Sequence, residues 1–482
     1  MKVLIFFDDT VPKSEAVRDV IGDKGFSQVV VKKHRLEEYY EKTLRSLYPD
    51  AMWQTVLSPY RFQEIRSHLS EEENVRVLHC FSNFIFSEKE KALLSFEKLN
   101  YIDVPYIGLL EEKPAFLLFP DIKSYGDFLG HVALGMTTLE AAKQIIPHFT
   151  VEGMVNIGQF QNFIQCITGN FDSRYFNSVN GDEYILTKRS TDKRKIKAEY
   201  TYYRLLPDDM KSWFVIPYNY EEDEKTASYR MEHLHMTDLA IRWVHGSVDE
   251  EEFKRLMDLY FHFFSIRHKK SVSEEEYWKI SDQLYRQKVL ERLRQLKKHE
   301  AFSKLEYMLE AGRNITLDDL ANRYFLLKEK VEKETTFPYI SVIGHGDPCF
   351  ANTLYSKSAQ MMKFIDPKGA LVEADLWTNP YYDIAKLSHS VCGSYDFFNN
   401  GLFEIRMEPD FMCQLYIDFD KQRYVKLFRK ALEENHFNYL VVRVYEVSLF
   451  LSMLPLHMDN PFKVFGFILN AEKIIKEIEN EI

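Results

Sequence analysis

The first 165 residues alternate short apolar runs with amphipathic stretches of about three turns. The runs read as buried strands and the stretches between them as helices. The strands are predicted at Val3–Phe7, Gln28–Val31, Val75–Cys80 and Ala115–Phe119, and the helices at Arg35–Leu47, Tyr60–Leu69 and Glu88–Leu99. This alternation predicts an α/β domain over residues 1–165 with a largely parallel sheet.

After residue 165 the pattern becomes polar and turn-rich. The stretch containing Gly169, Asn170 and Ser173 is followed by a strand-like run at 175–179. Asn180-Gly181 is a strong signal for a two-residue hairpin turn. We therefore expect an antiparallel sheet to begin here.

The returning strand of that hairpin, Glu183–Thr187, delivers Lys188, and a helical stretch from about Lys193 to Leu206 carries Glu199. A strand lysine paired with a helical glutamate is how kinases hold the phosphates of ATP. On its own this spacing is weak, because Lys and Glu more often form a solvated surface pair.

A second polar cluster follows the apolar run Val342–Ile343. The loop after it holds His345, Asp347 and Asn352, and two short β-like runs, 353–355 and 362–365, come next. If these runs pair as a hairpin, Asn352 lies beside Asp366. An amide and a carboxylate oxygen side by side suit Mg²⁺ with room for phosphate oxygens, and Asp347 could accept the proton of an attacking hydroxyl.

Composition narrows the class of protein. The net charge of −11 over 482 residues argues against a general nucleic-acid binder. Five scattered cysteines without a CxxC pair indicate a reducing compartment. The start of the chain lacks a signal-peptide pattern, and Tyr439–Leu456 reads as a buried helix, not a membrane span. We expect a cytoplasmic protein with no membrane span.

Three motifs together resemble the aminoglycoside phosphotransferase/choline kinase group of the protein-kinase-like fold. The motifs are His345-Gly346-Asp347-Pro348 with Asn352, Ile365-Asp366-Pro367, and Tyr382-Asp383-Ile384-Ala385. The resemblance covers residues 166–482. It implies an α+β fold with a small β-rich N-lobe at 166–235 and a large helical C-lobe at 236–482.

The same resemblance implies the roles of the site residues. The implied catalytic residues are Asp347, as the base, and His345. Asn352 and Asp366 are implied as Mg²⁺ ligands, and Lys188 with Glu199 at the phosphates of ATP. His345 is interpreted as bracing the loop, and Asp383 as a buried structural acid. The remaining expected nucleotide contacts come from the polar loop and from a hinge that lines adenine: Gly169, Asn170, Ser173, Glu232 and Leu234.

Finer details, such as Lys195-Ile-Lys-Ala-Glu199, are similar to bacterial capsular polysaccharide biosynthesis proteins. In those proteins a nucleotidyltransferase-like domain precedes the kinase-like one. Residues 1–165 depart from its pattern, with no Gly-rich loop after the first strand and with Ser82-Asn83 and Asn156 at the expected metal positions. We therefore interpret residues 1–165 as a degenerate, non-catalytic nucleotidyltransferase-like domain. Asp8-Asp9 is either a metal site or, more simply, a pair of solvated acids.

The leading hypothesis is therefore a phosphotransferase that uses ATP and Mg²⁺ on a hydroxyl of a small molecule. A sugar or polyol for capsule or surface polysaccharide is favoured over a protein, because little room for an activation segment separates Asp366 from Asp383 and no Ala-Pro-Glu follows. His389, Tyr395 and Asp396 are candidates for the acceptor site. A homodimer is left open.

Two other hypotheses remain. The first is a non-catalytic nucleotide-binding or scaffold protein, a pseudokinase of the same pathway. The second is a chain whose N-terminal half binds a sugar nucleotide and presents it to the kinase-like half.

Overall fold

The computed structural model describes residues 2–31, 33–68, 75–145, 147–167, 177–181, 184–234 and 236–482. The chain divides into two compact units, Met1–Ser173 and Arg174–Ile482. Each unit has its own sheet and its own buried apolar core.

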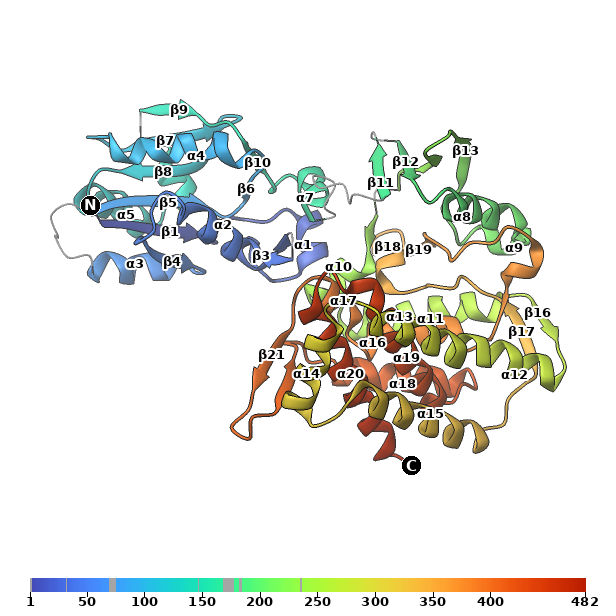
Figure 1. The fold of residues 1–482 in the computed structure, drawn as a ribbon. Helices are drawn as coiled ribbons and strands as arrows, with labels where there is room; N and C mark the ends of the chain where they lie inside the picture. The colour runs from blue at the N-terminus through green and yellow to red at the C-terminus, as the bar shows by residue number, and fades with distance from the viewer. Residues whose placement is uncertain are drawn as a thin grey trace. The chain divides into compact units, whose positions relative to one another are not determined.

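Unit 1 is built on a six-stranded sheet of order β4-β1-β5-β8-β7-β9 (Figure 1). Phe6 of β1 stacks on Tyr125 of α5, whereas its neighbour Phe7 packs on Tyr40 of α2. Because successive strand residues point to opposite faces, helices cover both sides of the sheet. The strands are β1 Lys2–Asp8, β4 Met52–Val56, β5 Val75–Phe81, β7 Tyr106–Leu110, β8 Lys113–Phe119 and β9 His148–Thr150. The helices are α1 Glu15–Ile21, α2 Leu36–Leu44, α3 Pro59–His68, α4 Lys89–Glu97, α5 Ile122–Ala133, α6 Thr138–Ala142 and α7 Phe160–Ile167.

The sheet of unit 1 is mixed, which corrects the prediction of a largely parallel one. β8 runs antiparallel to both β5 and β7. The cause is a tight turn at Glu111 and Glu112, which both have positive φ, as a two-residue hairpin turn of this type requires. The strand predicted at 28–31 is shorter than expected: Val30–Val31 forms β2, which pairs with β3, His34–Arg35, outside the main sheet.

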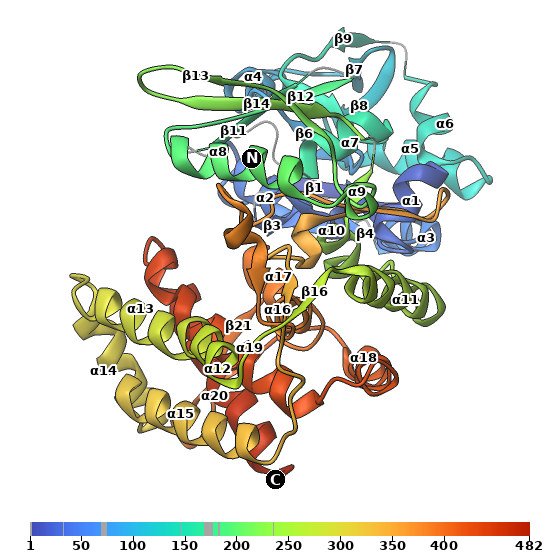
Figure 2. The same cartoon turned by 90° about the vertical axis from the view of Figure 1, so that its right-hand side faces the viewer.

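Unit 2 begins with a four-stranded antiparallel sheet of order β11-β12-β14-β13 and one long helix, α8. Figures 1 and 2 show this sheet and α8 together at one side of unit 2, with helices α12 to α20 at the other. The elements are β11 Asn177–Gly181, β12 Ile185–Ser190, α8 Lys193–Leu205, α9 Asp208–Lys211, β13 Pro217–Glu222 and β14 Ala227–Glu232. Asn180 and Gly181 pair with Thr187 and Leu186 as strand residues, so the turn comes later than predicted.

The rest of unit 2 is mostly helical around one large apolar core. Its helices are α10 Leu239–Val244, α11 Glu250–Ile266, α12 Glu274–Asp282, α13 Lys288–Lys297, α14 Phe302–Arg313, α15 Leu317–Lys333, α16 Tyr382–Val391, α17 Tyr395–Asn399, α18 Gln422–Glu434, α19 Tyr439–Met453 and α20 Pro461–Glu479. Among the described residues one helix, Tyr439–His457, is long and apolar enough to cross a membrane, but most of its apolar stretch is buried inside the protein. This burial is typical of a core helix, as predicted for that stretch.

Two small sheets sit among these helices. One has the order β15-β18-β19 and the other β16-β17-β20, and a separate hairpin pairs β21 with β22. The strands are β15 Thr237–Asp238, β16 Lys269–Ser271, β17 Ile340–Ile343, β18 Thr353–Ser356, β19 Met361–Phe364, β20 Trp377–Thr378, β21 Glu404–Met407 and β22 Cys413–Tyr416. The hairpin predicted after the polar loop is present as β18 and β19, with Thr353 opposite Phe364.

Candidate active site

A buried lysine joins the small sheet of unit 2 to the β18–β19 hairpin. The Nζ of Lys188, on β12, lies 2.8 Å from Glu199 Oε2 on α8 and 2.7 Å from Asp366 Oδ1, just after β19. The side chains of Lys188 and Glu199 are 3% and 1% exposed, whereas that of Asp366 is 40% exposed. The pair predicted from sequence, Lys188 and Glu199, is therefore a buried contact. The second partner of Lys188 is the predicted metal ligand Asp366, which faces solvent.

The charge state of this lysine follows from its neighbours. Burial alone would lower the pKa of Lys188, but the carboxylates of Asp366 and Glu199 outweigh burial and raise that pKa above its ordinary value. Lys188 is therefore an ammonium at neutral pH. It can exchange one carboxylate partner for an anionic ligand without changing protonation.

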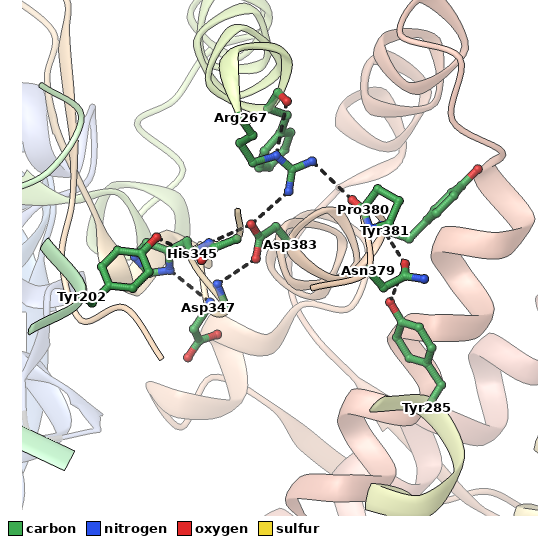
Figure 3. A network of polar contacts seen from close by, with 12 residues as sticks. Tyr202, Arg267, Tyr285, His345, Asp347, Asn379, Pro380, Tyr381 and Asp383 are labelled. Carbon is green, nitrogen blue, oxygen red and sulfur yellow. Dashed lines mark hydrogen bonds and ion pairs between the residues drawn. The ribbon is translucent and has the colours of Figure 1, made fainter. Parts of the chain in front are cut away.

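The loop between β17 and β18 is held by a buried acid on α16. Asp383 Oδ2 accepts hydrogen bonds from His345 N at 2.9 Å and from Arg267 Nη1 at 3.1 Å, and Oδ1 accepts from Gly346 N at 2.8 Å (Figure 3). Asp383 and Arg267 are both buried. Asp383 is thus the structural acid predicted, and it positions the backbone that leads to Asp347.

His345 braces this loop against the hairpin. Its Nε2 donates to Ile365 O at 3.0 Å, and its Nδ1 accepts from Asp347 N at 3.0 Å. Burial lowers the pKa of His345, so its ring is neutral and these two bonds set its tautomer. With both nitrogens occupied by backbone groups, His345 positions Asp347 and does not face a substrate.

Asp347 and Asn352 lie at the open end of the loop. The side chain of Asp347 is 39% exposed, and Figure 3 shows its carboxylate pointing away from the Asp383 network. Asn352 Nδ2 donates to Asp347 O at 2.9 Å, which turns the Asn352 Oδ1 away from that carbonyl. Ile365 N donates to Asn352 O at 3.0 Å, so Asn352 lies beside the residue that precedes Asp366. The structure thus brings Asp347, Asn352 and Asp366 to one end of the hairpin.

The donor set of this hairpin end fits Mg²⁺ bound together with phosphate oxygens. Asn352 Oδ1 and the Asp366 carboxylate are hard oxygen ligands, and Asp366 adopts a left-handed backbone conformation (φ 54°) that turns the chain directly after β19. Within the described ranges, no group of three or more His, Cys, Asp or Glu could hold a metal ion. A site completed by phosphate oxygens does not require a third side chain.

An apolar surface adjoins Lys188. Leu186, two residues before it and on the same face of β12, packs with Leu234, Leu354 and Ile365 against the apolar cluster under the small sheet. Glu232 ends β14 opposite Ile185, and the backbone oxygen of Leu234 accepts from Met236 N at 2.7 Å. Side chains from both the sheet and the hairpin therefore line this apolar surface.

Sequence reasoning did not identify Leu186, Leu354 or Lys386, whose Nζ lies 3.0 Å from Asp347 Oδ1. The period-2 spacing from Lys188 could have pointed to Leu186. Gly169, Asn170 and Ser173, predicted to contact the nucleotide, lie outside the described residues.

The three candidate acceptor residues lie on α16 and α17. The ring of His389 stacks on Tyr395 with centroids 4.3 Å apart, and neither ring nitrogen of the buried His389 has a hydrogen-bond partner. Electrostatic interactions with Asp347 act on both Tyr395 and Asp396. Of the three candidate acceptor residues, Tyr395 alone is partly exposed.

Asp396 should make the stability of the protein depend on pH. It is fully buried, and burial raises its pKa to about 7 from 3.8. The folded protein thus keeps a proton there that the unfolded chain releases, so stability falls as pH rises from about 4 to 7, by at most ~4 kcal/mol at pH 8. We expect Asp396→Asn to raise the Tm at pH 8 more than at pH 5.5. The exposed Asp258→Asn is the control, and an equal effect of Asp396→Asn at both pH values would contradict this assignment.

In unit 1 the paired acids at the end of β1, Asp8 and Asp9, each accept several hydrogen bonds. Asp8 is buried against His79 Nε2 at 3.1 Å and Thr10 N at 2.9 Å, and Asp9 accepts from Ser82 Oγ at 2.7 Å. Burial raises the pKa of Asp9. These contacts make both acids part of the packing at the end of β1. Asp8 is therefore neither a solvated acid nor an open metal ligand.

Two further positions of unit 1 meet in space. Asn83 Nδ2 donates to Asn156 Oδ1 at 3.2 Å, because β6 (Phe84–Phe86) pairs with β10 (Met154–Asn156). Both side chains are buried and uncharged. The two positions interpreted from sequence as replaced metal ligands thus lie in direct contact.

No protein-family model matches the chain, and no curated protein matches it either. Among solved structures, the chain is similar to the apo form of a thermostable mutant of aminoglycoside phosphotransferase APH(4)-Ia, with 11% identity and a TM-score of 0.36 over 63% of this chain and 94% of that one. It is also similar to aminoglycoside phosphotransferase APH(3'')-Id from Streptomyces rimosus in complex with ADP and streptomycin, with 11% identity and a TM-score of 0.28 over 59% of this chain and 98% of that one. TM-scores this low do not establish a common fold.

Proposed function

We propose that unit 2 is a phosphotransferase that uses ATP and Mg²⁺ to phosphorylate a hydroxyl of a small molecule. The observation that carries this proposal is the position of Lys188, a buried ammonium held between Glu199 and the half-exposed Asp366. Burying an ammonium is costly unless it is paired. A lysine with a purely structural role would not need the solvent-facing carboxylate of Asp366 as a partner. It would also not need Asn352 and the exposed Asp347 at the same end of the hairpin.

The residues divide the chemistry of transfer among themselves. Lys188 binds phosphate oxygens and neutralises their charge, while Glu199 holds its ammonium in place. Mg²⁺, held by Asn352 and Asp366, would neutralise charge on the phosphates and orient them. Asp347 accepts the proton of the acceptor hydroxyl while the hydroxyl oxygen forms its bond to the γ-phosphorus. The bond from that phosphorus to the bridging oxygen breaks, and ADP leaves with the electron pair.

The segment after Asp366 favours a small acceptor over a protein. Ala370 N donates to Ala198 O on α8 at 3.0 Å, and Gly344 N donates to Leu376 O at 3.0 Å. At Gly369 (φ +90°) the backbone lies so close to α8 that an added Cβ would come within 2.8 Å of the Ala198 carbonyl carbon. This described segment is therefore tied down at both ends, without a long free stretch on which to lay a peptide.

Within that class we favour a sugar or polyol used in capsule or surface polysaccharide synthesis. This choice rests on the sequence resemblance and on two polar side chains: Lys386, whose Nζ lies 3.0 Å from Asp347 Oδ1, and the partly exposed Tyr395 on α17. Unit 1 is then a degenerate nucleotidyltransferase-like domain without catalysis of its own. The contact between the uncharged Asn83 and Asn156 supports this, since amides in place of carboxylates remove most of the attraction for a divalent ion.

The rival is a protein of the same kind that binds nucleotide without transferring phosphate. Titration calorimetry with ATP, in Mg²⁺ and then in EDTA, tests the shared part of both proposals. Release of ADP in the presence of pooled sugars and polyols tests transfer. Mg²⁺-dependent binding with ADP release supports the enzyme, binding without release supports the rival, and absence of binding contradicts both.

Asp366→Asn should weaken binding of ATP in Mg²⁺ by at least tenfold. The substitution removes the charge of one metal ligand and one ionic partner of Lys188 while keeping its shape. In EDTA the variant should bind ATP at least as tightly as the wild type, because one carboxylate that competes for Lys188 is gone. An unchanged affinity in Mg²⁺ would remove Asp366 from the metal site.

A further inference from the structure

Lys386 lies one helical turn beyond Asp383 on α16 and reaches the other part of the same loop. Its Nζ is 3.0 Å from Asp347 Oδ1, and its side chain is 19% exposed. Residues three apart on a helix share a face. One face of α16 therefore contacts the loop at two points. Asp383 binds the loop backbone, and Lys386 binds the Asp347 side chain.

The charge of Lys386 is maintained by this contact. Burial would lower the pKa of Lys386, but Asp347 and the neighbouring Tyr382 raise it above its ordinary value. A buried ammonium needs a carboxylate partner, and a carboxylate with one oxygen held by an ammonium has a fixed direction. The contact thus restricts the rotation of the proposed base.

We infer that Lys386 is a positioning residue that fixes the Asp347 carboxylate for proton transfer. This inference rests on the proposed phosphotransferase function. Lys386 occupies Oδ1, which presents Oδ2 to the proton of the acceptor hydroxyl. General-base catalysis depends on a geometry held to fractions of an ångström, so loss of this restraint should slow transfer with little effect on ATP binding.

A purely structural ion pair is the alternative, and the chain offers a matched control for it. Lys328 Nζ lies 2.8 Å from Glu332 Oε2, with both side chains 11% exposed. This pair lies within α15, which packs against α19 and α20. Lys328→Met should therefore lower stability about as much as Lys386→Met and leave turnover unchanged.

The test compares Lys386→Met, Lys386→Arg and Lys328→Met with the wild-type full-length protein. The probes are ATP with Mg²⁺, with water alone and then with pooled sugars and polyols as acceptors. Calorimetry gives ATP affinity, ADP release gives kcat and the KM for ATP, and thermal melting reports folding.

We expect Lys386→Met to lower kcat by about 10- to 100-fold with the KM for ATP unchanged. Lys386→Arg should recover most of the rate, because a guanidinium can hold the same oxygen. Wild-type rates in Lys386→Met, or no recovery by Lys386→Arg in a folded protein, would overturn the inference. If the wild type binds ATP but releases no ADP with any acceptor, there is no base to position and the inference fails. Failure to bind ATP would instead refute the proposed function itself.

Discussion

Replacing Asp347 with asparagine is expected to lower phosphoryl transfer from ATP by about 10²- to 10⁴-fold. Asparagine keeps the shape of the side chain but cannot accept the proton of the attacking hydroxyl. ATP and Mg²⁺ should still bind, because Lys188, Asn352 and Asp366 are unchanged. The measurement is ADP release, together with calorimetry of ATP binding on the same sample.

The result has a clear contrary outcome. Full activity in Asp347→Asn would remove this residue as base. A parallel loss of ATP affinity would show that Asp347 acts on the nucleotide. Asp375→Asn is a suitable control, since Asp375 accepts a hydrogen bond from Leu371 N in the segment after Asp366 and has no role in the proposed chemistry.

Asp383→Asn is expected to cost about 3–5 kcal/mol of stability and to abolish turnover. The substitution leaves the buried Arg267 without its carboxylate and sets an amide donor near two backbone N–H donors of the loop. The loop that presents Asp347 should then lose its conformation. Urea unfolding gives the stability change, and ADP release gives the activity.

A second buried ion pair separates the two effects. Arg242 and Glu252 form a pair that is as deeply buried, with side chains 2% and 0% exposed, and the other cation near the Glu252 carboxylate is Lys357, beyond β18. Glu252→Gln should lose similar stability and retain transfer well below its melting temperature. If both variants lose activity equally, the loss reflects unfolding and not the loop.

The two parts of the site that sequence predicted well both depend on short-range pattern. Lys188 and Glu199 stand on adjacent elements whose periodicity is plain, so their meeting follows from one strand and one helix. Asn352 and Asp366 flank a hairpin whose register brings them together. In each case chain connectivity decides the geometry.

The parts that were missed depend on contacts between distant elements or on unusual turns. The turn at Glu111 and Glu112 carries no glycine or asparagine, so its left-handed conformations gave no signal. Lys386 is one of many lysines, and only the packing of α16 under the loop distinguishes it. The meeting of Asn83 with Asn156 depends on the pairing of two three-residue strands.

The anchorage of the segment after Asp366 also bears on how the site could be regulated. Ala370 is hydrogen-bonded to Ala198, one residue before Glu199, and Gly369 leaves no space between the segment and α8. Any displacement of Glu199 with α8 would therefore also displace the segment that follows Asp366. An outward movement of α8 that separated Glu199 from Lys188 would have to break the hydrogen bond between Ala370 and Ala198. The lysine site of the proposed phosphotransferase therefore stays assembled unless the segment after Asp366 detaches from α8.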